Sequence, residues 1–344
     1  MTTQNATHMR QEVEEIPSAV SRLLSEGKSD FAAAGAALRA RDPAAIVTIA
    51  RGSSDHASAF LKYSIELLAG VPVASVGPSI VSIYGRELKL GRTAAISISQ
   101  SGKSPDIVAM TESARRSGAL TFALTNTAGS PLAAAAEHTL ALRSGEEKSV
   151  AATKTFVASI VAGLGILGNW LEDKALLAAL DSLPGLLEQA VHVDWSPLLG
   201  ALDGHNSLYV LGRGPTLAIA SEAALKFKET CGIHAEAYSA AEVLHGPARI
   251  VEREFPVLAL TAGDAAEPSV AEVADRLTGQ GARVFLTSGK GTRAERLPLA
   301  ASGHPLTDAL ALIVTFYGFV EALSRHRGFN PDQPPHLRKV TETI

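Results

Sequence analysis

Hydroxyl and amide side chains gather at residues 99–104, where the sequence reads Ser-Gln-Ser-Gly-Lys-Ser. Pro105 and Asp106 follow, and such a pair is typical of the first turn of a helix. The free backbone N–H groups of that turn carry about half a positive charge and favour an anion. Side-chain donors come from Ser99, Gln100, Ser101 and Ser104. The segment predicts a phosphate-binding loop, with a loop that only caps the helix as the alternative.

A second loop of similar composition, Gly52-Ser53-Ser54, precedes Asp55 and also lies between an expected strand and an expected helix. Loops at the carboxyl ends of adjacent parallel strands face each other across one crevice. The two loops together therefore suit a small phosphorylated ligand. No ATP-binding P-loop occurs, and Gly212-Arg213-Gly214 is not a full dinucleotide fingerprint, so no nucleotide cofactor is expected.

Three charged residues, Glu222, Lys226 and Glu229, are spaced at i, i+4 and i+7 in an otherwise apolar helical segment. This spacing places them on one helix face. The simple interpretation is a solvated stripe with a Glu–Lys pair that contributes about 0.2–0.5 kcal/mol. The alternative interpretation is a base held by charged neighbours.

His245 precedes Gly246-Pro247, and a histidine fixed there is a candidate acid or base near neutral pH. A structural role is the alternative. A metal site made of His234, Glu236 and His245 is set aside, because no H-x-x-x-H helix or paired cysteine supports it. No metal is therefore expected.

Two further segments are ambiguous from composition. Residues 145–154 lead into a long apolar helix and are compatible with a simple capped loop. Residues 330–339 are rich in proline and charge, so they are expected either to fray or to close over a site.

Short β-rich runs alternate with helical segments, which predicts parallel βαβ units. The first series has expected strands at 46–50, 73–76, 94–99 and 120–125, with helices at 55–69, 105–117 and 150–171. The second, after residues 184–197, has expected strands at 207–212, 256–261 and 283–287 and a helix at 215–231.

The two series match each other. A shift of 162 places Gly52 on Gly214 and Gly70 on Gly232, and a shift of 163 aligns 118–122 with 281–285. Duplication is therefore expected. The predicted fold is α/β, with tandem three-layer αβα sandwiches and mostly parallel sheets. Residues 1–190 would hold the ligand-binding loops, and residues 191–344 the catalytic residues and a closing tail.

Composition indicates an ordinary globular protein, with 46% hydrophobic and 19% charged residues among 344. A net charge of −4 argues against nucleic acid or anionic membrane as a partner. Cys231 is the single cysteine, which suits a reducing compartment. No export signal is read at the N-terminus, and residues 156–171 are too short for a spanning helix, so a cytoplasmic protein is expected.

Taken in order, these motifs resemble those of the sugar isomerase (SIS) family over nearly the whole chain. They are similar to the isomerase half of glutamine–fructose-6-phosphate aminotransferase. The sequence resembles still more closely the isomerase-only, alternative type of glucosamine-6-phosphate deaminase. This closer resemblance is found at residues 51–56, 101–106 and 145–148. The segments that carry the resemblance are 52–54, 99–102, 150–154, 222–229, 234–238, 244–247 and 332–334 with Lys339.

The resemblance implies a role for each motif. The phosphate would be held by Ser99, Gln100, Ser101 and Ser104, and the sugar contacted at Gly52, Ser53, Ser54, Val150 and Ala151. Glu229 would move a proton between C1 and C2, while His245 of the neighbouring subunit of a homodimer would open the ring. Lys226, Glu222 and Lys339 would orient and balance Glu229.

Departures from the aminotransferase pattern narrow the expected reaction. The chain begins Met1-Thr2 and its only cysteine is Cys231, so the glutamine-hydrolysing half is expected to be missing. Ala152 stands at a position where the aminotransferase has a serine, and Lys103 stands where it has an acidic residue. The expected function is conversion of glucosamine 6-phosphate to fructose 6-phosphate and ammonia, without a cofactor. The alternatives are an enzyme for another amino-sugar or glycated-amine phosphate, and a non-catalytic phosphosugar sensor.

Overall fold

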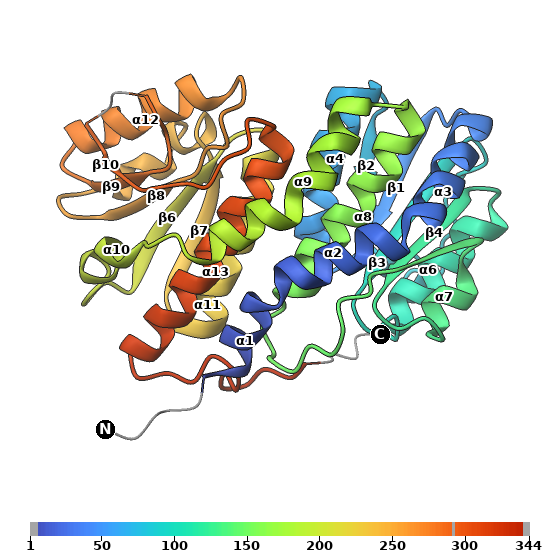
Figure 1. Ribbon diagram of the computed structural model, residues 1–344, viewed down its shortest axis with the longest axis horizontal. Coiled ribbons are helices and arrows are strands. Elements are labelled where there is room, and N and C mark those ends of the chain that lie inside the picture. Colours follow the sequence, from blue (N-terminus) through green and yellow to red (C-terminus); the bar gives the residue numbers. More distant parts are fainter. Residues whose placement is uncertain (1–5, 291–292, 340–344) are drawn as a thin grey trace. The chain divides into compact units, whose positions relative to one another are not determined.

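The computed structural model describes residues 6–290 and 293–339, and the chain divides into two compact units. The first-copy unit comprises residues 16–147, 154–184 and 338 onward; the second-copy unit comprises residues up to 15, 148–153 and 185–337. Each unit contains a five-stranded parallel sheet with helices packed on it (Figure 1). The division into functional domains at residue 190 stays a prediction.

The sheet of the first-copy unit has the order β2-β1-β3-β4-β5. Its strands are β1 (Ala45–Ile49), β2 (Val73–Ser75), β3 (Thr93–Ser99), β4 (Leu120–Thr125) and β5 (His138–Ala141). Its helices are α2 (Ile16–Glu26), α3 (Lys28–Arg41), α4 (Ser53–Ala69), α5 (Ser79–Ser82), α6 (Pro105–Arg116), α7 (Pro131–Ala135) and α8 (Lys154–Leu171). Helix α9 (Lys174–Val191) spans the division between the units.

Helices on both faces explain the composition of the central strands. Every residue of β3 after Thr93 is buried, and β4 is buried from Thr121 onward. Helix α8 packs against α2, α3 and α4, while α6 covers the other side with a core that includes Ile107 and Met110. Strands covered on both faces are continuously apolar or small rather than alternating.

The second-copy unit repeats this plan, with the order β7-β6-β8-β9-β10. Its strands are β6 (Ser207–Gly212), β7 (His234–Ser239), β8 (Pro256–Ala259), β9 (Arg283–Leu286) and β10 (Glu295–Arg296). Its helices are α1 (His8–Glu14), α10 (Ser196–Ala201), α11 (Pro215–Cys231), α12 (Glu267–Gly279) and α13 (Pro305–His326), with 3₁₀ turns η1 (Glu242–Leu244) and η2 (Pro247–Ile250). The series β6-α11-β7-β8-α12-β9-β10 corresponds one to one with β1-α4-β2-β3-α6-β4-β5 of the first-copy unit.

Matched glycines support the duplication at the level of the backbone. Gly52 has φ 57° and ψ −134°, and Gly214 has φ 63° and ψ −137°, each directly before the long helix of its copy. Gly70 and Gly232 end those helices at φ 67° and φ 61°. These conformations favour glycine in both copies. The predicted tandem αβα architecture is confirmed.

The structure corrects the start of one predicted helix. Helix α8 begins at Lys154 rather than Val150, because Glu147 acts as its cap. The Glu147 carboxylate accepts from the backbone N–H of Thr155 at 3.1 Å and from the Thr155 hydroxyl at 2.8 Å. Residues 148–153 therefore lie outside the helix, with bends at residues 149–151. Strands β5, β7 and β10 were not anticipated, and Pro184 lies inside α9.

Two helices, α8 and α13, are long and apolar enough to cross a membrane by length and composition alone. Their apolar windows are 89% and 94% buried within the structure. Such burial is typical of the core helices of a globular fold.

Candidate functional site

The loop after β3 has the geometry of an anion-binding turn. Ser99 is buried at the end of β3, and its hydroxyl oxygen accepts the backbone N–H of Gly102 at 3.2 Å. The hydroxyl oxygen of Ser101 accepts the N–H of Lys103 at 3.3 Å. Because both oxygens act as acceptors, both O–H groups can donate to a ligand. The half-buried Gln100 and Ser104 belong to the same turn, and Pro105 begins α6.

Gly102 fixes the shape of this loop. Its φ is +62°, and a Cβ at this position would collide with the Ser130 side chain and lie 2.9 Å from Oγ1 of Thr125. The carbonyl of Gly102 accepts the N–H of Leu132 at 3.0 Å, and the carbonyl of Gln100 accepts the N–H of Asn126 at 3.1 Å. The loop is thus packed against the end of β4, where only glycine fits.

The loop after β1 is tied by a charged pair to the loop at residues 99–104, which we call the phosphate loop after its predicted role. Nε of Arg51 donates to Oδ2 of Asp106 at 2.6 Å, and this carboxylate is fully buried. Oδ1 of Asp106 accepts the N–H of Ile107 at 2.8 Å. Since β1 and β3 are adjacent, Gly52, Ser53 and Ser54 stand at the same sheet edge as Ser99. Sequence reasoning did not single out this pair, although an acid directly after Pro105 was a visible signal.

The equivalent turn of the second copy is occupied by its own carboxylate. Asp264 precedes α12, and its Oδ1 accepts the N–H of Ala266 at 3.0 Å. Burial raises the pKa of Asp264, against the opposing effect of the backbone N–H groups of Ala266 and Glu267. A resident carboxylate disfavours a phosphate at this helix start. The difference supports the prediction that the first copy holds the anion.

In the second-copy unit, α11 presents the predicted charged face. Nζ of Lys226 lies 3.1 Å from Oε1 of Glu222 and donates to Oε2 of Glu229 at 2.7 Å. Glu222 and Lys226 are fully buried, whereas the side chain of Glu229 is 21% exposed. The solvated-stripe interpretation is therefore wrong. We call these three residues the charged triad.

The electrostatics of the charged triad keep its lysine ionised. Burial by itself would lower the pKa of Lys226, but the charges of Glu222 and Glu229, and their hydrogen bonds, raise it above the ordinary lysine value. One cation between two carboxylates leaves a net charge of about −1. Glu229 is the partly exposed member of the charged triad.

A pocket of about 500 Å³ in the second-copy unit opens beside Glu229. Its walls are mainly apolar and include Leu225 and Thr230 of α11, and Phe329, Pro334 and Leu337 of the C-terminal tail. Glu229 thus lies at the wall of a mainly apolar pocket. The tail therefore covers this pocket rather than fraying.

His245 and Lys339, the remaining predicted catalytic residues, lie outside the triad's hydrogen bonds. His245 is exposed and ends the turn η1. Nζ of Lys339 is 2.8 Å from Oε2 of Glu147, the carboxylate that caps α8. The ion pair of Lys339 with Glu147 was not anticipated.

Residues 148–153, which include the predicted contacts Val150 and Ala151, are held by a buried carboxylate on α1. Glu12 is 4% exposed and accepts the backbone N–H groups of Lys148 and Ser149 and the hydroxyl of Ser149. The same hydroxyl also contacts the carbonyl of Ala151 at 3.1 Å. Glu12 is a positioning residue that sequence reasoning missed, because its spacing relative to residue 148 carries no signal.

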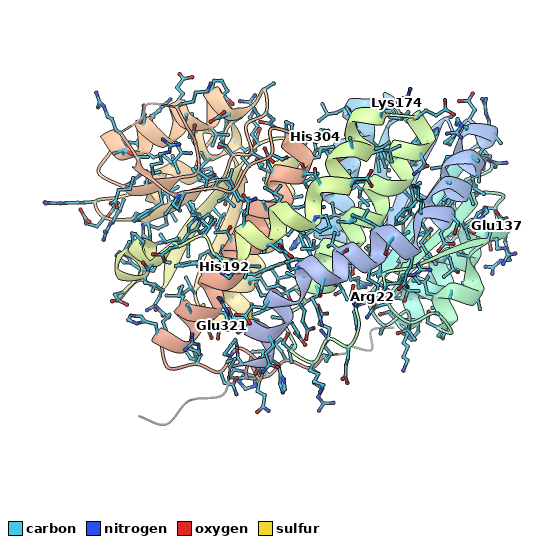
Figure 2. All side chains as sticks on the ribbon, in the orientation of Figure 1. Arg22, Glu137, Lys174, His192, His304 and Glu321 are labelled. Carbon is cyan, nitrogen blue, oxygen red and sulfur yellow. The ribbon has the colours of Figure 1, made fainter. Side chains whose placement is uncertain are left out.

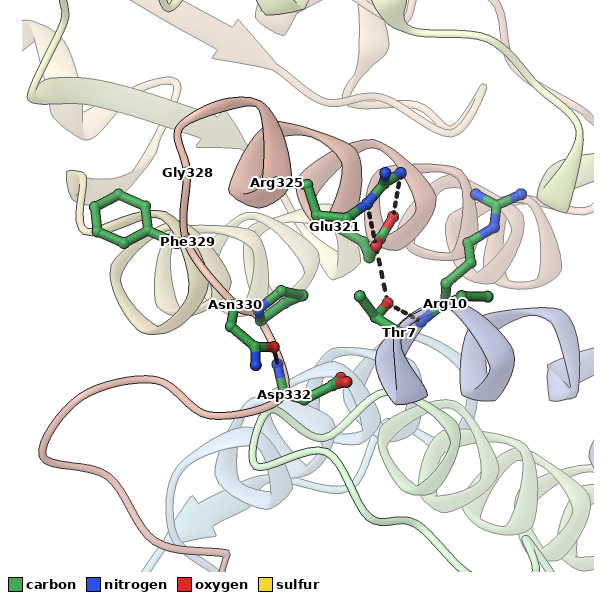
Figure 3. A pocket seen from close by; sticks show the side chains of 10 residues that line it. Thr7, Arg10, Glu321, Arg325, Gly328, Phe329, Asn330 and Asp332 are labelled. Atoms are coloured by element: carbon green, nitrogen blue, oxygen red, sulfur yellow. Dashed lines mark hydrogen bonds and ion pairs between the residues drawn. The ribbon is translucent and has the colours of Figure 1, made fainter. Parts of the chain in front are cut away.

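A larger pocket of about 690 Å³ lies between α1, α13 and the tail (Figure 3). Its charges are already paired: Thr7 donates to Glu321 at 2.8 Å, and Nε of Arg325 donates to the same carboxylate at 2.7 Å. Asp332 accepts the N–H groups of His8 and Met9, both at 2.8 Å, and so caps α1. Figure 2 shows Glu321 on α13 beside α1. The polar contacts around this pocket therefore connect α1, α13 and the tail, and they satisfy the charges of Glu321, Arg325 and Asp332.

Within residues 6–290 and 293–339, no group of three His, Cys, Asp or Glu side chains is arranged to hold a metal ion. Glu236 was one member of the metal site considered from the sequence. In the structure its carboxylate accepts a hydrogen bond from the hydroxyl of Tyr238 at 3.1 Å.

These features define a tandem αβα protein with an anion-binding type of loop in its first copy and a buried charged triad in its second. The chain belongs to the SIS domain family, whose model matches residues 41–165 and 202–317.

Curated relatives of this chain are longer than it is. It is 32% identical over 352 aligned residues to a glutamine–fructose-6-phosphate aminotransferase [isomerizing] of Aeropyrum pernix, covering 96% of the chain and 56% of that protein. A protein of the same name from Symbiobacterium thermophilum is 33% identical over 314 residues, and the match covers 86% of this chain and 51% of that protein. The chain spans about half the length of these curated relatives.

Solved structures show the same fold. A candidate phosphosugar isomerase from Silicibacter pomeroyi DSS-3 is 56% identical, with a TM-score of 0.92 over 95% of this chain and 100% of that one. A glucosamine-6-phosphate deaminase from Thermotoga maritima is 17% identical, with a TM-score of 0.78 over 98% of this chain and 100% of that one. Because its sequence identity is only 17%, the similarity to the Thermotoga maritima structure shows a shared fold and nothing more.

Proposed function

We propose that this protein converts glucosamine 6-phosphate and water to fructose 6-phosphate and ammonia. The observation that carries the proposal is the charged triad, in which a buried lysine holds Glu229 at the wall of an apolar pocket. Family membership and the phosphate-type loop at residues 99–104 support a phosphosugar substrate.

The reaction needs one base that serves two adjacent carbons. In the open-chain sugar, Glu229 takes the proton from C2, giving an enolamine, and returns a proton to C1. The product is an imine at C2, and water adds to it and releases ammonia. Lys226 binds Oε2 of Glu229, so the proton would pass through Oε1. One carboxylate fixed at the wall of an apolar pocket is suited to such transfer.

The other predicted residues complete the proposal. The phosphate would be bound by Ser99, Gln100, Ser101 and Ser104, with the sugar at Gly52, Ser53, Ser54, Val150 and Ala151. His245 of a neighbouring subunit would open the ring. In this proposal residues 1–190 supply the binding loops and residues 191–344 the catalytic groups, in a cytoplasmic homodimer.

The test is to incubate purified protein with glucosamine 6-phosphate and to measure ammonia and fructose 6-phosphate separately. We expect equimolar products, and we expect Glu229→Gln to lower kcat at least about 100-fold while calorimetric binding of the substrate persists. Binding without turnover by the unmodified protein would support a sensor instead. Turnover only of another amine phosphate would overturn the substrate assignment.

The phosphate loop has a separate test. Ser101→Ala removes one hydroxyl donor and should raise KM with little change in kcat. Ser269→Ala is a matched control, because its hydroxyl only donates to the carbonyl of Ala266 at 2.7 Å. An unchanged KM in Ser101→Ala would remove this residue from the proposed phosphate site.

A further inference from the structure

A buried tyrosine on α13 extends the charged triad. The hydroxyl of Tyr317 donates to Oε1 of Glu222 at 3.1 Å, the same oxygen that Lys226 approaches at 3.1 Å. Tyr317, Glu222 and Lys226 are all fully buried. The contacts form a continuous series from α13 through α11 to Glu229 at the pocket wall.

We infer that Tyr317 is a positioning residue for Glu229, acting through Glu222 to set how the Lys226 ammonium is shared between the two carboxylates. This inference goes beyond the proposed function and rests on it only for its kinetic measurement.

The physical reason is competition for one cation. A buried carboxylate that accepts a hydroxyl proton has part of its charge satisfied and attracts a neighbouring ammonium less strongly. When Tyr317 donates to Glu222, Lys226 is freer to make its 2.7 Å bond to Glu229. Without that donor, Lys226 would shift toward Glu222, and Glu229 would lose its orientation.

Other titratable groups on α11, and on the elements that pack against it, have partners of their own. On α13, Glu321 is bonded by Thr7 and Arg325. On β7, which packs against α11, Glu236 accepts the hydroxyl of Tyr238. On α11 itself, Nζ of Lys228 donates to the carbonyl of Ala235 at 3.1 Å. On β6, the hydroxyl of Tyr209 donates to the carbonyl of Pro247 at 3.0 Å.

The variant that tests the inference is Tyr317→Phe, which removes only the hydroxyl. We expect kcat to fall roughly tenfold with KM nearly unchanged. The acid limb of the pH–rate profile should move upward by about one pH unit, because a buried net negative charge that loses a donor takes up its first proton at higher pH. Tyr209→Phe is the matched control and should alter neither quantity.

A double-mutant cycle shows whether Tyr317 acts through Glu222. If it does, adding Tyr317→Phe to Glu222→Gln should produce no further movement of the acid limb. An additive effect of the two changes would overturn the inference.

A measurement without substrate separates this inference from the proposed function. Protein labelled with ¹³C at the glutamate carboxyl carbon is titrated by NMR, with Glu229→Gln and Glu222→Gln assigning the two resonances. We expect their titration to begin at higher pH in Tyr317→Phe than in the unmodified protein. Identical titrations in a folded Tyr317→Phe protein would overturn the positioning role, even if no turnover of glucosamine 6-phosphate is found.

Discussion

The guanidinium of Arg51, which follows β1, and the buried carboxylate of Asp106, in the first turn of α6, are joined by a 2.6 Å contact. Arg51 leads into the Gly-Ser-Ser loop, and Asp106 lies in the first turn of α6 behind the phosphate loop. The pair therefore holds the two loops together at the carboxyl end of the sheet. A ligand bound there would meet hydrogen-bond donors that this contact keeps in place.

Asp106→Asn should weaken substrate binding by loosening this contact. The amide keeps the shape but loses the charge that faces Arg51, and hydrogen bonds to charged groups contribute about 1.5–3 kcal/mol. We expect KM to rise about tenfold or more. The control is Glu87→Gln, which removes the exposed pair with Arg116 at 3.1 Å. Equal KM values in the two variants would contradict the role of Asp106.

Gly102→Ala should destroy the phosphate loop for steric reasons. Its Cβ would meet Ser130 and Thr125 in a backbone at φ +62°. Gly85→Ala is the control, because Gly85 has φ +58° but open space around it. Both variants carry the strain of a left-handed residue, so a larger loss of binding and stability in Gly102→Ala isolates the collision. Thermal denaturation and substrate titration measure the two effects.

Lys226→Met should lower the free energy of unfolding by about 3–5 kcal/mol, because two carboxylates would then be left without their buried cation. Lys62→Met, at a partly exposed pair with Glu66, should cost less than about 1 kcal/mol. Denaturant unfolding measures both values. Similar losses in the two variants would contradict a buried ionic role for Lys226.

The pH dependence of that loss has a definite sign. The pKa of Lys226 is raised in the folded protein, so its contribution is complete below the ordinary lysine value of about 10.4. It is lost only as pH rises through the higher folded value. The stability difference between Lys226→Met and the unmodified protein should therefore be constant from about pH 6 to 9 and shrink above about pH 10.

Cys231 should be inert toward thiol reagents in the folded protein. Burial raises the pKa of its thiol to about 12, and the hydrogen bond with Thr230 and the charge of Arg327 oppose this only partly. Below the ordinary thiol pKa the thiol is neutral in both the folded and the unfolded state. Between that value and about 12 only the unfolded thiol ionises, so the free energy of unfolding falls as pH rises through this range. At pH 8, one thiol per chain should react with a disulfide reagent in guanidinium and almost none without it. Rapid labelling under native conditions would contradict this burial.

Mixing two inactive variants tests whether His245 acts across subunits. Glu229→Gln and His245→Ala, unfolded and refolded together, would form hybrid dimers with one intact site if the two residues come from different chains. We expect about a quarter of the unmodified activity in the mixture. Activity no higher than that of the separate variants would place both residues in one subunit or remove the dimer.

Much of the fold was predictable from the sequence because it depends on local patterns. The glycines at 52, 70, 214 and 232 mark helix boundaries, since their positive φ values are costly for other residues. The apolar strand β4 matches its predicted range at both ends. Strand β7 was missed, because its residues His-Ala-Glu-Ala-Tyr-Ser are half-polar and lie at a sheet edge.

The candidate site was predictable in part. Spacing placed Glu222, Lys226 and Glu229 on one face, but it could not show that two of them are buried, since burial depends on α13. Tyr317 and Glu12 gave no signal, because each acts through contacts between distant segments: 95 positions to Glu222 and 137 to Ser149. The start of α8 was misplaced because a side chain seven residues before it, Glu147, supplies the cap.

The capping of α1 by Asp332 has a consequence for biosynthesis. His8 and Asp332 are 324 positions apart, and α1 also packs against α13 near the other end of the chain. At ribosomal rates of about 5–20 residues per second, α1 waits roughly 15 s to a minute for these partners. Helix α1 is thus made first but is the last helix of the second-copy unit to pack. Truncations that remove either end of the chain should leave the other end exposed to proteases.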